Sequence, residues 1–590
     1  EAENSNDGDG NALKTMGLSF GMAMTDLNTE VKVEQGALVN VGRDVDLLAL
    51  TEQTISNTVS FKASGDGASG GPAIGLSLLN SDTRAEFSAD LNGARNLNVS
   101  AANLMHEQVS KVTVEAGASK SEADRIKEKA EEKESDGVTD YLADTVKGLF
   151  GFEPQDRETR EAASAADPSK PEGSIGTPTD SKFRLASALG VSIADHEVEA
   201  VVGSGNAAPE LNLSGDLTLQ ALQEQSKLRN VAESKVNSAA KRNDGSKDDA
   251  DVSLSVAAVY GQQDQNTRAL IGDGSQVTAE RIGLSARNVQ QLDLLGLDRW
   301  SSLEEVYDNL KLLKDKKQGI VGEFATQYAN SKGAAEKLGM AGSLSVLVGR
   351  NQATSWVGDN VSLTATATED ADWTRSTFHL LPEIADDEAR EALLERETEW
   401  SAPLAVQAST DIQLLALAGN FDKLFGVTAS KGGAVGAGLN IQITDNRSIA
   451  GIGAGGSVTA EAVDVSARQV ELIIGLSPSA GKGPSVAGNG SVAVSVIDST
   501  SHASIHSSTQ VEADKVNLDA EHQLGLWTAV GALAASQNVG LAGGVAVNVV
   551  NSDVYSLVGD NNQQRNGRNL WRPELMGTGA ENANAATWMV

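Results

Sequence analysis

A pattern that returns every 53 residues constrains the fold of this chain more than any other feature. Residues 458–467 (VTAEAVDVSA) reappear at 511–520 (VEADKVNLDA), and residues 441–450 (IQITDNRSIA) reappear at 494–503 (VSVIDSTSHA) and 547–556 (VNVVNSDVYS). Self-similarity at a fixed period is typical of repeat proteins, in which each unit buries its apolar face only against its neighbours. Such a chain usually forms an extended structural or binding surface rather than an enzyme with a single pocket.

Within each unit, apolar and polar residues alternate, which predicts β-strands with one aliphatic face. A cluster of Asn, Asp, Ser and Thr follows, as at 551–553, and predicts a turn because these side chains bond their own backbone. A second strand then closes on a glycine, and another strand follows, as at 277–286. Eight copies can be aligned, and they lie near residues 17, 74, 189, 254, 344, 441, 494 and 547.

We therefore expect an all-β fold, an elongated β-solenoid (a right-handed parallel β-helix) with helical and loop insertions. A three-sided coil needs about 20 residues at ordinary strand lengths. The 53-residue period thus fits either two coils or one unusually wide coil. A hairpin across the turn at 551–553 is a third arrangement, which would give an antiparallel stack.

Segments of different character interrupt the repeats. Residues 121–133, 302–313 and 382–399 have charge pairs, a capping box or an N-terminal proline, which predict helices. Residues 223–251 are polar and predict a helix that frays into a loop, and the proline-bearing 154–182 predicts a linker. The predicted order is an N-terminal segment (1–16), repeats (17–116), helical insertion and linker (117–182), repeats (183–298), helical insertion (299–340), a repeat (341–374), helical insertion (375–403), regular repeats (404–560) and a C-terminal tail (561–590).

Composition excludes several functions. The chain has no cysteine, which rules out disulfides, thiolate metal sites and cysteine catalysis. Its formal charge of −34 argues against nucleic acid and anionic lipid as partners. No apolar run reaches the ~20 residues of a membrane helix, so we expect no membrane insertion. The chain opens at Glu1 without a signal sequence, and we expect it to be a segment of a larger protein.

Motif searches identify no catalytic residue. Residues 67–71 (GASGG) match the nucleophile elbow in letters, but they continue a glycine-rich turn and precede a strand rather than a helix. Residues 7–11 (DGDGN) begin like a calcium loop, yet the sixth position is Ala12 and the twelfth is Leu18 instead of the required Gly and Glu. We expect no cofactor, with Ca²⁺ as the one ion the acidic surface could hold.

Three charged patterns recur in the repeats. Asp273, Asp359 and Asp560 follow glycines at equivalent turns, so their carboxylates are candidate metal ligands if they stack, and solvated turn residues otherwise. Arg84, Arg268 and Arg447 lie in or just after equivalent turns; they would form a basic line if stacked, and are scattered solvated arginines otherwise. His502 and His506 share one strand parity, which predicts an outward surface position.

Residues 544–552 (GVAVNVVNS), 555–560 (YSLVGD) and 458–467 resemble the repeats of very large Gram-negative exoproteins, the filamentous-adhesin and leukotoxin-type families. The resemblance covers most of residues 17–560 outside the insertions and implies a secreted or surface-displayed β-solenoid, with no catalytic residues carried over. We expect an extracellular structural or adhesive segment of a giant fibre, which binds a glycan or protein on a host or neighbouring cell. The alternatives are a filament subunit that stacks end to end, and a β-helix polysaccharide lyase or hydrolase.

Overall fold

The computed structural model describes residues 15–63, 69–116, 183–205, 207–236, 251–290, 325–368, 373–374, 399–419 and 428–559. These ranges form 28 strands and contain no helix, so the expectation of an all-β fold is confirmed. All pairings between strands are parallel except that of the two-stranded sheet β18–β19. Nowhere in the described ranges is there an apolar helix of the length that crosses a bilayer.

The chain winds through three sheets in turn. Strand β22 (Gly433–Ile452) leads through the short β23 (Ser457–Thr459) into β24 (Ala462–Lys482), and the chain then returns to β25 (Val486–Ile505), which pairs with β22 along its whole length. We call this path a circuit. It pairs Gly433 with Val486, so one 53-residue repeat is one wide circuit rather than two narrow coils. A strand of 20 residues is about 65 Å long.

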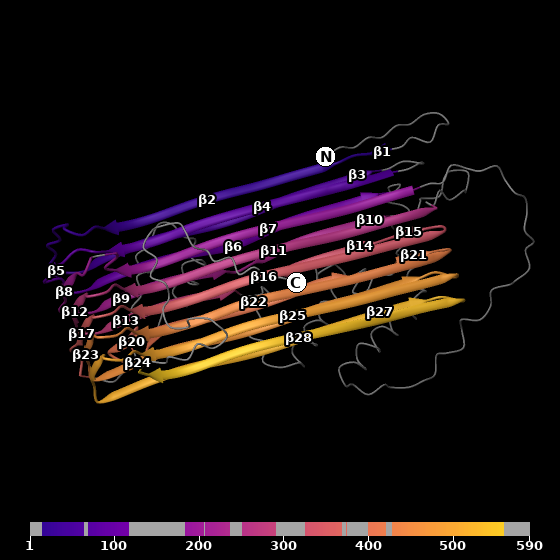
Figure 1. The fold of residues 1–590 in the computed structure, drawn as a ribbon. Helices are drawn as coiled ribbons and strands as arrows, with labels where there is room; N and C mark the ends of the chain where they lie inside the picture. Colours follow the sequence, from indigo (N-terminus) through magenta and orange to yellow (C-terminus); the bar gives the residue numbers. More distant parts are fainter. Residues whose placement is uncertain are drawn as a thin grey trace, which may run out of the picture.

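Figure 1 shows the circuits stacked in chain order, with the short strands along one side. The nine-stranded sheet contains β1 (Thr15–Met16), β2 (Ser19–Val33), β4 (Ser69–Phe87), β7 (Phe183–Val202), β11 (Val252–Ile271), β16 (Leu338–Val357), β22, β25 and β28 (Val539–Val558). The six-stranded sheet contains β5 (Leu91–Asn92), β8 (Glu210–Asn212), β12 (Gln276–Ala279), β17 (Ser362–Ala365), β23 and β26 (Gln510–Glu512).

The eleven-stranded sheet contains β3 (Val45–Ala63), β6 (Leu97–Ala116), β9 (Leu217–Gln225), β10 (Leu228–Val236), β13 (Ile282–Gln290), β14 (Gln327–Lys332), β15 (Ala334–Ala335), β20 (Leu404–Gly419), β21 (Thr428–Ser430), β24 and β27 (Lys515–Ala535). Strands β1 and β2 both pair with β4, so the nine-stranded sheet has eight rows. These rows correspond to the eight sequence copies.

The turn predicted at 551–553 is wrong. These residues lie inside the continuous strand β28, in parallel register with residues 498–500 of β25, and the hairpin arrangement is therefore wrong as well. The physical reason is visible two and three circuits earlier, where inward-facing polar side chains of successive rows bond one another. Asn351 Nδ2, for example, donates to Asn446 Oδ1 at 2.7 Å. A polar side chain that finds this partner does not need a turn.

The space between the two long sheets changes character along the strands. Next to the six-stranded sheet it is apolar, with Phe87, Leu97, Leu217 and Ile271 fully buried. Half-way along the strands it becomes polar, and the buried residues there include Gln53, Asn103, Gln223, Gln225, Gln263, Gln265, Asn288, Asn351, Asn446 and Gln469. In this zone His196 Nδ1 lies 2.7 Å from Ser81 Oγ, and burial lowers the pKa of His196 to about 4.

Parts of the segments that the sequence predicts as helical or as helical insertions are strands. Residues 223–251 contain the end of β9 and all of β10, and the proposed insertion 299–340 contains β14, β15 and the start of β16. In the proposed insertion 375–403, β19 (Glu399–Trp400) pairs antiparallel with β18 (Trp373–Thr374). These segments continue the sheet ladders, whose tertiary pairing outweighs local helix preference. The helices predicted at 121–133, 302–313 and most of 382–399, the linker 154–182 and the calcium-like residues 7–11 lie outside the described residues.

Candidate functional site

The outer face of the nine-stranded sheet is apolar over part of its width. Because the strands are in parallel register, side chains that point outward form columns across the rows. Three adjacent columns, the apolar columns, are almost entirely hydrophobic and partly or fully exposed. They are Phe20–Ile74–Leu189–Ala258–Leu344–Leu439–Val492–Val545, Met22–Leu76–Val191–Tyr260–Val346–Ile441–Val494–Val547 and Met24–Leu78–Ile193–Gln262–Val348–Ile443–Val496–Val549.

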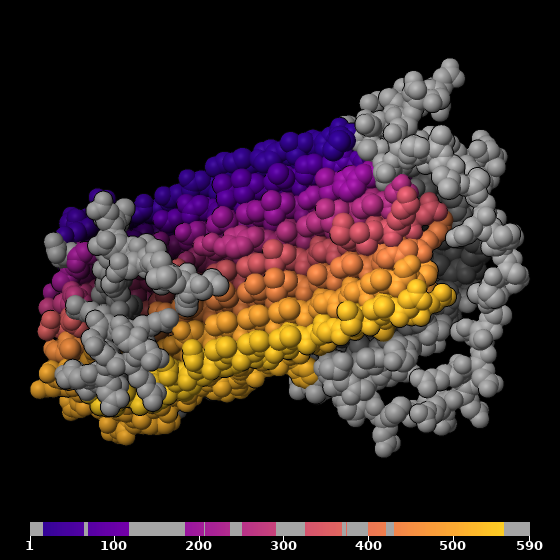
Figure 2. All heavy atoms as spheres, turned by 45° about the vertical axis from the view of Figure 1, so that its right-hand side comes forward, coloured from indigo at the N-terminus to yellow at the C-terminus, as the bar shows by residue number. Residues whose placement is uncertain are grey.

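Two columns of different character border the apolar columns. On one side lies the acidic column, Asp26–Asn80–Asp195–Asp264–Arg350–Asp445–Asp498–Asn551. On the other lies the shallow column, Pro72–Ser187–Val256–Gly342–Ala437–Gly490–Gly543, where a Cβ added at any of its three glycines would meet nothing within 4 Å. Figure 2 shows the rows running side by side from the indigo to the yellow end.

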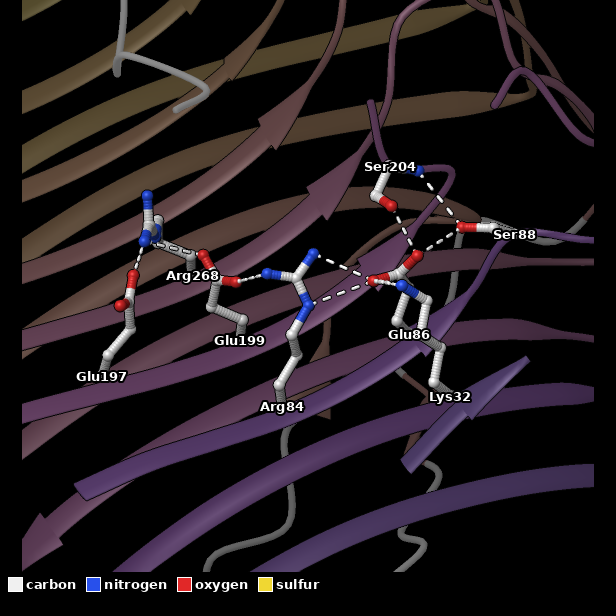
Figure 3. A network of polar contacts seen from close by, with 8 residues as sticks. All are labelled: Lys32, Arg84, Glu86, Ser88, Glu197, Glu199, Ser204 and Arg268. Atoms are coloured by element: carbon white, nitrogen blue, oxygen red, sulfur yellow. Dashed lines mark hydrogen bonds and ion pairs between the residues drawn. The ribbon is translucent and has the colours of Figure 1, made fainter. Parts of the chain in front are cut away.

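A charged network lies further along the same face, on β2, β4, β7 and β11 (Figure 3). Arg84 Nη1 lies 2.5 Å from Glu199 Oε2, and Arg84 Nη2 lies 3.0 Å from Glu86 Oε2. Arg268 Nη2 lies 2.7 Å from Glu199 Oε1 and also contacts Glu197. The charges therefore alternate across three successive rows, from Arg84 through Glu199 to Arg268.

Glu86 is the most enclosed acid of the network, with a side chain 2% exposed. Burial by itself would raise its pKa, but hydrogen bonds from Ser204 and Ser88, together with Arg84 and Lys32, outweigh burial and lower the pKa. Ser88 Oγ donates to Glu86 Oε1 at 2.8 Å, and Lys32 Nζ lies 3.5 Å from Oε2. Glu86 is thus held as a carboxylate with several donors.

The pKa shifts of Glu199 and Arg268 favour the neutral forms of these side chains, whereas the shift of Glu86 favours its charged form. Burial raises the pKa of Glu199 and lowers that of Arg268 to about 10, although Arg84 partly offsets the effect on Glu199. A buried ion pair of this kind is strongly destabilising when one partner is removed, since the other charge is left uncompensated. The network therefore joins the first four rows mechanically.

The basic line predicted from Arg84, Arg268 and Arg447 is wrong. Arg84 and Arg268 do share a column, but Glu199 stands between them in that column. Arg447 lies in the adjacent column and pairs with Asp445, with Nη2 2.8 Å from Oδ2. All three are inside strands rather than at turns. The alternation of positive and negative charges in this column becomes visible only when the rows are aligned in space, because insertions of different length separate them in the sequence.

The candidate metal ligands Asp273 and Asp359 do lie at equivalent turns, and each bonds the backbone of the next circuit. Asp273 Oδ1 accepts a hydrogen bond from Asp359 N at 2.8 Å, and Asp359 Oδ1 accepts one from Ala454 N at 2.9 Å. Asp560 lies outside the described residues. Among the residues that are described, no three His, Cys, Asp or Glu side chains are grouped as metal ligands.

The remaining sequence candidates fall inside the fold. Ser69 begins β4 and is 3% exposed, so the elbow-like letters lead into a strand, as expected. His502 points outward but is 3% exposed, so the predicted surface position is wrong. Its ring lies edge-on to Tyr555, with centroids 6.4 Å apart, and burial lowers the pKa of His502 to about 4.

Sequence reasoning missed the apolar columns, although the alternation that marks each strand also defines its outward face. Some polar side chains bond one another inside the stack, as Asn351 and Asn446 do, whereas aliphatic residues fill the outward columns. Comparison with protein-family models, with curated proteins and with solved structures gave no match.

Proposed function

We propose that this chain is a β-solenoid segment of an extracellular or cell-surface bacterial fibre, and that it acts as a structural and adhesive unit through the outer face of its nine-stranded sheet. The observation that carries the proposal is the set of apolar columns, which span eight rows with Gln262 as their one polar member. Contiguous exposed apolar patches larger than a few hundred Å² usually mark interaction sites on soluble proteins. The resemblance to large exoprotein repeats supports the extracellular location.

The chemistry of the face favours a protein partner over a glycan. Sugar rings stack on aromatic side chains, but the apolar columns contain only two aromatic residues, Phe20 and Tyr260, on separate rows. The other members are aliphatic residues, methionines and one glutamine. Aliphatic surface gains free energy when another apolar surface excludes water from it, which is the typical situation in a protein interface.

The test is the binding of protein-coated beads to cells that display this protein and to cells that lack it. The variant Val494→Asp places a charge in the central apolar column and should reduce binding at least tenfold, because a buried unpaired carboxylate is costly. The matched control is Ser466→Asp on the outer face of the eleven-stranded sheet, which should bind normally. Equal binding by both variants would remove the nine-stranded face from the proposal.

End-to-end stacking into filaments is a second candidate. Strand β28 exposes residues of both its faces, with Leu541 70% and Val558 69% exposed, and β2 at the other end of the described stack exposes Phe20 and Met24. Electron microscopy with and without calcium distinguishes the two functions. Isolated particles support the adhesive unit, whereas continuous fibres support stacking.

A glycan lyase or hydrolase is a third candidate, favoured by the three carboxylates and two arginines of the network in Figure 3. Their charges are matched in ion pairs, and Glu86 is held ionised, which makes it a poor general acid. The test is release of unsaturated or reducing ends from acidic and neutral polysaccharides. Activity that disappears in Glu199→Gln would favour this candidate.

A further inference from the structure

We propose that the partner of the nine-stranded face is the same face of a second copy, so that two molecules pack laterally with their strands antiparallel. The inference rests on the proposed function, because it names the partner of the adhesive face. It differs from end-to-end stacking, since it uses outward side chains rather than strand edges. Homotypic pairing of this kind would join neighbouring fibres or neighbouring cells.

The size of the face fits a stable dimer. Eight rows at about 4.8 Å span about 38 Å, and three columns at about 7 Å span about 20 Å. The apolar columns therefore offer about 800 Å² per copy, which is the usual contribution of one partner to a specific interface. Two such faces can pack as sheets do in a sandwich, about 10 Å apart.

The charges select one of two symmetric arrangements. A two-fold axis parallel to the strands would place the acidic column on its own copy with the row order reversed. Asp195 would then face Asp445 and Asp264 would face Arg350, but each column carries five aspartates and one arginine, so the two columns would repel each other overall. An axis parallel to the stacking direction reverses the column order. The central apolar column then faces itself, and the acidic column faces the shallow column.

The second arrangement also fits in shape. Above Gly342, Gly490 and Gly543 of the shallow column there is open space. In this arrangement Arg350, Asp498 and Asn551 of the opposing copy can extend over these glycines toward solvent without meeting a side chain. Within the pair, each strand lies opposite its own copy, so Ile441 of the central column faces Ile441 of the second molecule.

The absence of cysteine allows a direct test. Ile441→Cys is treated with a bismaleimide whose reach matches the about 10 Å between packed sheets. We expect a covalent dimer from Ile441→Cys and none from Ser466→Cys on the eleven-stranded sheet. A dimer that resists cross-linking at Ile441 would overturn the proposed axis.

Sedimentation velocity measures the equilibrium. We expect Ile441→Asp to weaken the dimer at least tenfold and Ser466→Asp to leave it unchanged. Ile441→Thr keeps a β-branched residue in the strand and should also weaken it, which separates lost association from lost folding, as monitored by thermal unfolding. Monomers at every soluble concentration would overturn the proposal. If such monomers still bind cells that lack the protein, the adhesive function stands and only its partner changes.

Discussion

The two long sheets are built by the same circuits but differ in continuity. From β4 to β28, each row of the nine-stranded sheet is one unbroken strand of 19 or 20 residues. In the eleven-stranded sheet, β9 is separated from β10, and β13 ends at Gln290 whereas β14 begins at Gln327. Both sheets use parallel ladders, so the ladder alone does not demand an unbroken row. The continuity of the nine-stranded sheet therefore points to its outer face, which breaks would interrupt.

The outer faces of the two long sheets also differ in how far their ion pairs are buried. Breaking one ion pair on each face should therefore reduce stability by different amounts. Arg84→Ala leaves Glu86 and Glu199 without a main counter-ion and should cost about 3–5 kcal/mol. Arg468→Ala on the eleven-stranded sheet removes a 3.5 Å pair with Glu521 in which both side chains are exposed, and should cost less than about 1 kcal/mol. Urea unfolding of both variants measures the difference. Equal losses in the free energy of unfolding would show that the network of Figure 3 stabilises the fold no more than an exposed ion pair does.

The polar interior behind the nine-stranded sheet should make stability depend on pH. His196 has a folded pKa of about 4, below its ordinary 6.5, so the unfolded chain binds more protons between these values. Stability is therefore complete above pH 6.5 and falls by about 3 kcal/mol as the pH drops toward 4. His196→Gln copies Gln265 of the next row and should remove this contribution.

The wild-type and His196→Gln proteins should be compared as a difference, because Asp82, Asp195, Asp264 and Glu199 have raised pKa values and act in the opposite sense in both. His522→Gln, in β27 of the eleven-stranded sheet, is the matched substitution of a second histidine. A parallel loss of stability with falling pH in wild type and His196→Gln would contradict the assignment.

Inserting residues into each long sheet tests whether the unbroken rows of the nine-stranded sheet are needed for binding. Six Gly/Ser residues after Ser226, at the natural break between β9 and β10, should cost about 1 kcal/mol and leave bead binding intact. The same insertion after Val259, inside β11 and between Ala258 and Tyr260 of the apolar columns, should cost about 2 kcal/mol, since a few ladder hydrogen bonds are also lost. It should nevertheless abolish binding by breaking the apolar columns. Retained binding would show that the unbroken rows serve stability alone.

The sequence predicts the repeat and its strands well, but it leaves the path of the circuit open and predicts the chemistry of the faces poorly. Alternation and the 53-residue spacing are local, so residues 441–450 and 494–503 can be recognised as equivalent strands. The roles of Asn446 and Glu199 depend on rows that lie 95 and 115 residues away in sequence, through Asn351 and Arg84. Insertions of different length separate these rows, and a single sequence does not show which residues they bring together. The stacking of the rows allows turn-forming residues such as 551–553 to lie in the middle of a strand. It also aligns the outward aliphatic residues into one apolar face.

The smallest predicted effect separates stability from association. Gly490 lies in the shallow column and Gly531 in β27 of the eleven-stranded sheet, and an added Cβ at either position meets nothing within 4 Å. Replacing either glycine by alanine should stabilise the fold by about 0.5 kcal/mol, since the unfolded chain loses freedom. Only Gly490→Ala places a methyl group where the opposing acidic column would lie, so it should weaken the dimer about threefold, whereas Gly531→Ala should not. Sedimentation and thermal unfolding of the two variants measure both quantities. If both alanines stabilise and neither changes association, the shallow column is not part of the interface.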